Sequence, residues 1–272
     1  MLELLKVLLA GIASDGIDYI STFISLQMVE SVMYAERSIS EAVAGADFSG
    51  VFMVTYSFGM ALVVLKFLKK GADIYLIATD GDATNEPTGL FMELIKAIVV
   101  IVAFPTLYDW LYQAVSTLTN DLLAVLSFQV NIASVAASIV TLGIFPLIIM
   151  LIFLILYVVL FVQFVMRGIE ILILRAGLPL AAVGLMDADG GIFASYAKKF
   201  FQSALTVIVQ LFLAKLAIAL LVSFDTFWAL GAILMAIKTP RFLNEFMLTS
   251  GGVNVYQSMQ MARIMKGVIR RK

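Results

Sequence analysis

Residues 142–166 read LGIFPLIIMLIFLILYVVLFVQFVM, a run of 25 residues without a charged side chain. A helix needs roughly 20 mostly apolar residues to cross the hydrocarbon core of a bilayer. The whole chain follows the same trend, because 62% of its 272 residues are hydrophobic, 14% are charged and the mean hydropathy is +1.04. A soluble domain is nearer to about 45–50% apolar and about 25% charged. We therefore expect an all-α, polytopic membrane protein.

Four other apolar stretches are candidates for crossing the membrane, namely residues 48–68, 94–114, 200–224 and 227–237. The last of these has only 11 residues before Lys238 and Pro240, so it spans only if it begins earlier or tilts against its neighbours. Together with residues 142–166, these stretches predict about five transmembrane helices.

Residues 169–186 are a sixth apolar stretch. It contains three residues that are unusual in a span, Glu170, Arg175 and Pro179. The stretch could cross as a charged span, but we expect a re-entrant or interfacial segment on the cytoplasmic side, because Gly177 and Pro179 disfavour a continuous helix. Such backbone is tolerated at membrane depth where protein or a water-filled cavity covers it. A crossing here would also place Lys198 and Lys199 on the outer side.

The basic residues predict the orientation. Lys and Arg concentrate on the cytoplasmic side of membrane proteins. If the N-terminus is outside and the chain crosses five times, most of the 18 Lys and Arg residues fall on the cytoplasmic side. The opposite orientation would expose them outside. We therefore expect a multi-pass protein of the cytoplasmic membrane, with its N-terminus outside and its C-terminus in the cytoplasm.

The chain divides into three parts by composition. Residues 1–47 form an extracytoplasmic N-terminal segment, residues 48–240 the transmembrane core and residues 241–272 a cytoplasmic basic tail. Apolar residues recur at helical spacing in the first part and predict an amphipathic helix on the outer face: Ile17, Ile20, Ile24 and Met28. The apolar run 4–12 could instead belong to a cleaved signal peptide. The tail can fix the topology, or bind anionic lipid, nucleic acid or a cytoplasmic partner.

The residue types argue against an enzyme. The chain has no His and no Cys, so it lacks the commonest general base, the commonest metal ligand and any thiolate. It contains neither a P-loop nor a G-x-S-x-G motif. Two acidic turns, 80–82 and 187–190, begin like calcium-binding loops, but their twelfth positions are Phe91 and Lys198 instead of the required Glu. We expect no catalysis, no cofactor and no metal.

Charged side chains inside apolar stretches are the remaining signal, because a charge at mid-bilayer usually faces a cavity or a partner. Lys215 lies deep in the stretch 200–224. It either lines an aqueous path, pairs with an acid such as Asp109 or Glu170, or extends along its own stem to the interface. Arg167 and Glu170 are three residues apart and should be neighbours on one helix face. Arg175 is off that face, so it needs another partner, and we favour an ion-pair network.

Four uncharged polar or amphipathic residues also lie in or near the expected spans. Gln163 and Gln210 are polar positions within apolar stretches. Trp110 and Trp228 both lie near the ends of expected spans, which fits an aromatic belt at the interface. Core packing is the alternative for each tryptophan.

The second half of the chain carries a sequence pattern. The longest apolar run ends in Arg167-Gly-Ile-Glu170, continues through Leu174-Arg175 to Pro179-Leu180, and is followed by Lys198-Lys199-Phe200 and another apolar stretch. This pattern resembles the TrbL-like family, the polytopic inner-membrane subunit of type IV secretion systems in conjugal transfer. The stretch with Pro105, Asp109 and Trp110 also fits the family. The resemblance covers roughly residues 50–240.

The resemblance implies a subunit of the translocation channel with no enzymatic activity. Such a subunit would form a homo-oligomer around the path of the translocated DNA or protein. It would contact the lipid bilayer, other membrane subunits of the secretion system and its cytoplasmic ATPases. A small secondary transporter or ion channel that uses Lys215 is the alternative, since discontinuous helices often build binding sites. Against it, the chain shows no internal repeat.

Overall fold

The computed structural model describes residue 11 and residues 26–43, 47–79, 87–125, 144–187, 191–223 and 225–250. The regular elements in these ranges are all helices, which confirms the expected all-α fold. In chain order they are α2 (Leu26–Met33), α3 (Ala35–Ala42), α4 (Phe48–Thr79), α5 (Pro87–Val125), α7 (Ile144–Ala182), the 3₁₀-helix η1 (Val183–Met186), α8 (Gly191–Val222) and α9 (Thr226–Ser250). The run 4–12, the turn 80–82 and the tail from residue 251 lie outside the described residues.

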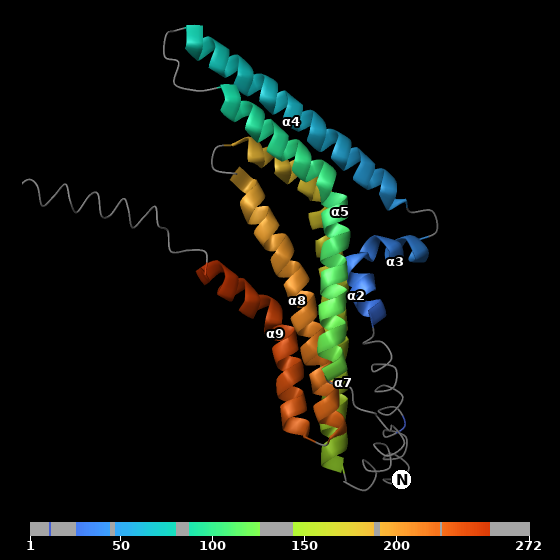
Figure 1. The fold of residues 1–272 in the computed structure, drawn as a ribbon. Helices are drawn as coiled ribbons and strands as arrows, with labels where there is room; N and C mark the ends of the chain where they lie inside the picture. The colour runs from blue at the N-terminus through green and yellow to red at the C-terminus, as the bar shows by residue number, and fades with distance from the viewer. Residues whose placement is uncertain are drawn as a thin grey trace, which may run out of the picture.

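The helices form an elongated bundle (Figure 1). Helices α5, α7 and α8 run along its length, and α9 turns back along α8. Helix α4 packs on α7 and α5 at one end of the bundle, while the short α2 and α3 lie against the middle of α7. The core between the long helices is built from fully buried side chains such as Leu160, Phe164 and Leu211.

Four helices are long and apolar enough to cross a membrane: Phe48–Leu76, Thr88–Val125, Ile148–Met186 and Ile192–Val222. They overlap the stretches expected to be the first four spans, and the third of them continues through the sixth apolar stretch, 169–186. The fifth expected span, residues 227–237, is helical within α9 but is not among the four. Helices α5 and α7 each have 39 residues, or about 58 Å at 1.5 Å per residue, which is about twice the hydrocarbon thickness.

The expected break in residues 169–186 is wrong. Helix α7 continues through Gly177 and Pro179 to Ala182, and η1 follows directly, so no re-entrant hairpin forms. Pro179 has no N–H to donate to the carbonyl of Arg175, so one helical hydrogen bond is lost, close to the end of α7 at Ala182. Gly177 has a packing role instead, because the hydroxyl of Tyr196 on α8 occupies the space that a Cβ would need.

The crossing of α4 and α7 depends on a second glycine. A Cβ on Gly59 would lie 2.7 Å from Cβ and 2.8 Å from the backbone of Pro179, so α4 can approach α7 this closely only with glycine at this position.

The first turn of α4 is set by Asp47, whose carboxylate accepts hydrogen bonds from the backbone N–H of Ser49 at 2.9 Å and from its hydroxyl. These bonds hold the pKa of Asp47 below its usual value and satisfy one of the free N–H groups at the helix start.

The described part of the N-terminal segment is buried against the bundle. Met28, Val29, Val32 and Met33 of α2 pack into the main core. The close approach to α7 is possible at Gly168, whose Cβ would lie 3.2 Å from Cβ of Ala35. Met28 is therefore part of an apolar stripe as expected, whereas the three isoleucines assigned to the same stripe lie outside the described residues.

Candidate functional site

Arg175 lies at the centre of a cluster formed by four helices. Its guanidinium, on α7, forms an ion pair and hydrogen bond with Glu36 on α3. Both side chains are nearly buried, with exposed fractions of 17% and 11%. Three aromatic rings surround the guanidinium, with centroid distances of 4.2 Å to Tyr108, 4.7 Å to Phe52 and 5.3 Å to Tyr34. Arg175 thus has the partner away from Arg167 that the sequence required, and cation–π contacts add to the pair.

Tyr34 links the N-terminal segment to α5. It lies between α2 and α3, and its hydroxyl donates a hydrogen bond of 2.6 Å to Asp109. The Tyr108 hydroxyl donates to the backbone carbonyl of Met33, where α2 ends and its last carbonyls need donors. Burial, and then the bond to Asp109, raise the pKa of Tyr34 well above its usual value. The phenol therefore stays neutral and acts as a fixed donor.

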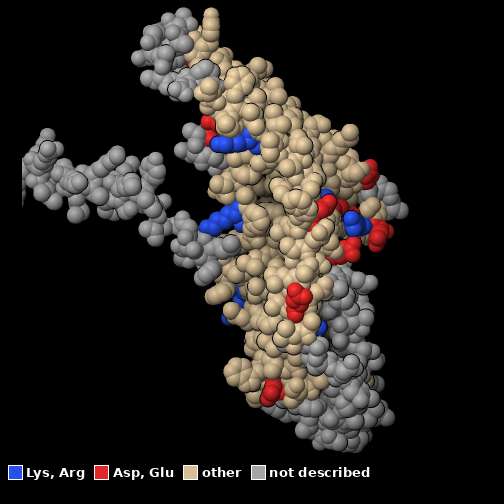
Figure 2. Space-filling model, in the orientation of Figure 1, with Lys and Arg blue, Asp and Glu red and all other residues tan. Residues whose placement is uncertain are grey.

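The Glu36–Arg175 pair contradicts the expected depths of its two partners. Hydropathy placed Glu36 outside the membrane and Arg175 on the cytoplasmic side, yet the two side chains are in direct contact. The reason is the length of α7, which carries an uncharged half followed by a half that includes Arg167, Glu170 and Arg175. The segment α2–α3 packs beside this second half. Figure 2 shows acidic and basic side chains gathered around α3 and the start of α4, with other charged side chains scattered over the same face.

A second charge network joins α7 to α8. Arg167 and Glu170 are in contact on one helix face, as expected from their spacing. Lys199 of α8 pairs with the other carboxylate oxygen of Glu170 at 2.9 Å, and the Ser203 hydroxyl lies 3.3 Å from that oxygen. In the part of the chain that the structure describes, no three acidic side chains gather as metal ligands.

Lys215 contacts neither of the acids proposed as its partners. Its ammonium donates to the backbone carbonyl of Leu123 at 3.0 Å, in the last turn of α5. A cation stabilises the negative end of a helix dipole, so Lys215 caps α5. Of the alternatives for Lys215, pairing with Asp109 or Glu170 is wrong, and these acids accept from Tyr34 and from Arg167 and Lys199, respectively.

Two lysines of α4 donate in the same way to carbonyls of η1, which directly follows α7. Lys66 donates to the carbonyl of Val183 at 3.3 Å and pairs with Asp187 at 2.8 Å. Lys70 donates to the carbonyl of Met186 and pairs with Glu93 at 2.9 Å. Asp187, which began one of the two calcium-like turns, is thus part of a helix-capping ion pair.

A neutral polar network connects α7, α8 and α9. Gln210 is fully buried, and its side-chain amide donates to Gln163 at 3.2 Å and to the backbone carbonyl of Ala236 at 3.1 Å. In a regular helix that carbonyl would accept from the N–H four residues later. That residue is Pro240, which has no N–H. Gln210 therefore supplies the donor that Pro240 lacks, and α9, the helix that contains Pro240, is bent (Figure 1).

The remaining expected site residues lie apart from these networks. Trp110 and Trp228 have exposed fractions of 63% and 75%, so core packing is wrong for both and the surface position of an aromatic belt is retained. Pro179 lies against Gly59 of α4.

Sequence reasoning missed four members of the Arg175 cluster: Tyr34, Glu36, Phe52 and Tyr108. Only one signal was available, namely that the apolar N-terminal segment carries acids while Arg175 needed an acid. No spacing rule connects positions 139 residues apart. For Gln210, the separation of Ala236 and Pro240 by four residues was a usable signal.

The comparisons with known proteins give one match. A family model described as conjugal transfer protein TrbL covers residues 1–270. The match extends well beyond residues 50–240, and so includes α2, α3 and Glu36. No curated protein and no solved structure matches the chain.

Proposed function

The chain belongs to the TrbL family of conjugal transfer proteins, and on that premise we propose that it is a channel or scaffold subunit of a bacterial type IV secretion machine. It would line or organise the path of DNA or protein across the cytoplasmic membrane without catalysing a reaction. We further propose that it works as a homo-oligomer. Its other partners would be the membrane subunits and ATPases of the same machine.

The Arg175 cluster is the observation that carries the scaffold role. Arg175 and Glu36 neutralise each other under a cover of aromatic rings, and Arg167, Glu170 and Lys199 are likewise paired. A charge that couples ion movement to transport has to change partner or protonation state during the cycle. Charges that are already paired favour a fixed framework, and Lys215 on a helix end gives the transporter alternative no support.

The orientation is part of the proposal. We propose that the N-terminus lies outside and the C-terminus in the cytoplasm, which requires α9 to cross as a fifth span in addition to the four long apolar helices. The lysines in the second half of α4, Lys66, Lys69 and Lys70, support this, because basic residues are retained on the cytoplasmic side. The turn between α7 and α8, which is tied to Lys66 through Asp187, would then be cytoplasmic as well.

Deletion of the gene in its native host, followed by a conjugation assay, tests the proposal. We expect DNA transfer to fall to background and to return when the intact gene is supplied on a plasmid. Complementation with Arg175→Ala should fail, because Glu36 would be left buried without its cation. Arg37→Ala should complement, since Arg37 forms an exposed pair with Glu30. Immunoblots of membrane fractions check that each variant is present.

Unchanged transfer in the deletion strain would contradict the proposal. Normal transfer with Arg175→Ala, at normal protein level, would show instead that the charge cluster is not needed for the scaffold role.

A further inference from the structure

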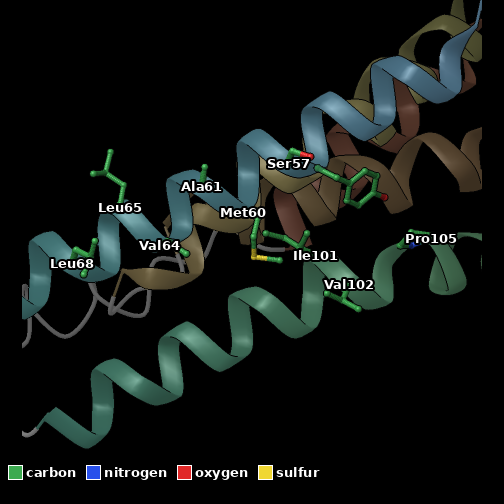
Figure 3. A pocket seen from close by; sticks show the side chains of 10 residues that line it. Ser57, Met60, Ala61, Val64, Leu65, Leu68, Ile101, Val102 and Pro105 are labelled. Atoms are coloured by element: carbon green, nitrogen blue, oxygen red, sulfur yellow. The ribbon is translucent and has the colours of Figure 1, made fainter.

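An open apolar groove runs between α4 and α5. It has a volume of about 760 Å³, and its lining includes Ser57, Ala61, Val64, Leu65 and Leu68 of α4 and Pro105 of α5. Figure 3 shows Met60 and Ile101 between the two helices, with Ser57 and Pro105 at one end and Leu68 at the other. Proline inside a helix removes a hydrogen bond and favours a bend, and α5 does bend, away from α4 (Figure 1).

The groove lies on the least covered side of the bundle. In the apolar part of α4 only 11% of the residues are buried, against 50% in the apolar part of α8. Leu65 and Leu68 of the groove are largely exposed. In a membrane, this surface faces lipid rather than water, so an apolar occupant is favoured.

The groove has the length of one leaflet. The apolar stretch 48–68 covers about 31 Å at 1.5 Å per residue, close to the whole hydrocarbon core of about 30 Å. The groove runs from Ser57 to Leu68 on α4, which is about 17 Å at the same rise, and therefore corresponds to the second half of the core. One acyl chain of a phospholipid has this reach.

A cation lies where the groove ends. Lys69 is exposed and is four residues after Leu65, so the two side chains are neighbours on the helix surface. Lys66 and Lys70 are engaged with Asp187 and Glu93. Lys69 forms no hydrogen bond or ion pair with any residue that the structure describes. Its ammonium is thus available to a phosphate at the depth where the hydrocarbon ends.

We propose that the α4–α5 groove binds an anionic phospholipid, with an acyl chain along Ala61, Val64 and Leu68 and the phosphate on Lys69. Anionic lipids enrich the cytoplasmic leaflet, and each basic residue near the surface contributes to their binding. The site is independent of the secretion role, since the lipid would be held by a single protein chain whatever its partners are.

Lipid titration of the purified, delipidated full-length protein tests the site by native mass spectrometry. The probes are phosphatidylglycerol and, for comparison, zwitterionic phosphatidylcholine. We expect one tightly bound phosphatidylglycerol. Ala61→Trp fills the groove and should weaken binding of both lipids by about tenfold or more, which is readily resolved as a change of about 1.4 kcal/mol. Lys69→Gln should weaken phosphatidylglycerol by about fivefold and leave phosphatidylcholine unchanged.

Phe58→Trp is the matched control. Phe58 is an exposed residue of α4 that does not line the groove, so the same bulk there should leave both affinities unchanged. Equal binding by wild type and Ala61→Trp would overturn the proposal. So would a change of oligomeric state in Ala61→Trp without loss of lipid, which would assign the groove to a helix of a second copy. An equal effect of Lys69→Gln on the two lipids would overturn the assignment of the phosphate to Lys69.

Discussion

Two of the polar networks inside the bundle have opposite character. The Arg175 network on the α3 side is charged, and pairs Arg175 with Glu36 beneath the rings of Tyr108 and Phe52. The Gln210 network on the α9 side is neutral, and consists of amide bonds to Gln163 and to the carbonyl of Ala236. Both are enclosed by apolar side chains.

The difference shows two uses of polarity inside an apolar fold. A buried charge is costly unless it is paired, so the Arg175 network makes the position of the N-terminal segment depend on one contact. An amide carries no net charge and costs less to bury than a charged group. Gln210 can therefore replace a missing backbone hydrogen-bond donor without needing a counterion. The first network fixes which segments meet, and the second lets α9 contain a proline.

Arg175→Ala should produce the largest effect. It leaves Glu36 buried without its cation, and we expect the free energy of unfolding to fall by about 3 kcal/mol. Chemical denaturation in detergent micelles measures the loss. Arg37→Ala is the matched control, because Arg37 also lies over the Tyr34 ring, at 4.3 Å, but its pair with Glu30 is exposed. That variant should lose less than about 1 kcal/mol. Equal losses would mean that burial does not distinguish the two pairs.

Gln210→Leu should have the second largest effect. We expect the free energy of unfolding to fall by about 2 kcal/mol, because the carbonyl of Ala236 becomes a buried acceptor without a donor. The same substitution in a Pro240→Ala background should cost roughly half as much, since the alanine would supply the missing backbone N–H. The double-mutant cycle uses the same unfolding measurement. An identical cost in both backgrounds would show that Gln210 does not compensate for Pro240.

Tyr34→Phe should have a smaller effect. We expect the free energy of unfolding to fall by about 1 kcal/mol, because Asp109 is exposed and water can replace the phenol hydroxyl. The N-terminal segment should also exchange its backbone amide protons faster, which hydrogen-exchange mass spectrometry detects. The control is Tyr112→Phe, since Tyr112 contacts the Tyr34 ring at 4.8 Å but forms no hydrogen bond through its hydroxyl within the described residues. Similar exchange in both variants would argue against the Tyr34–Asp109 bond.

Lys215→Met should have the smallest effect. A cation at the C-terminus of a helix contributes about 0.5 kcal/mol, and the variant should therefore remain folded and support conjugation. Lys215→Arg, which keeps the charge, should match the wild type in both assays. Loss of transfer by a normally folded Lys215→Met variant would restore Lys215 as a coupling residue and favour the transporter alternative.

The sequence predicted the parts of the site that depend on local geometry. Arg167 and Glu170 are neighbours because three residues on a helix bring side chains to one face. The need of Arg175 for another partner followed from the same rule. The identity of that partner did not, because Glu36 is 139 residues away and reaches Arg175 only through the packing of α3 on α7. For Lys215, an acid was one of the alternatives that its charge left open, whereas the structure places its ammonium on the carbonyl of Leu123.

The membrane class and helical fold were determined by the sequence alone, because an uncharged run such as residues 142–166 satisfies its backbone in lipid only as a helix. The TrbL-like pattern of Arg167, Glu170, Arg175 and Pro179 was also visible in the chain. Only the tertiary structure decided that α7 continues through Pro179, that Glu36 and Arg175 lie at one depth and that Gln210 serves Pro240. Hydropathy reports the composition of each helix, but the stagger between helices is set by side chains that meet across the bundle, such as Gly59 on Pro179.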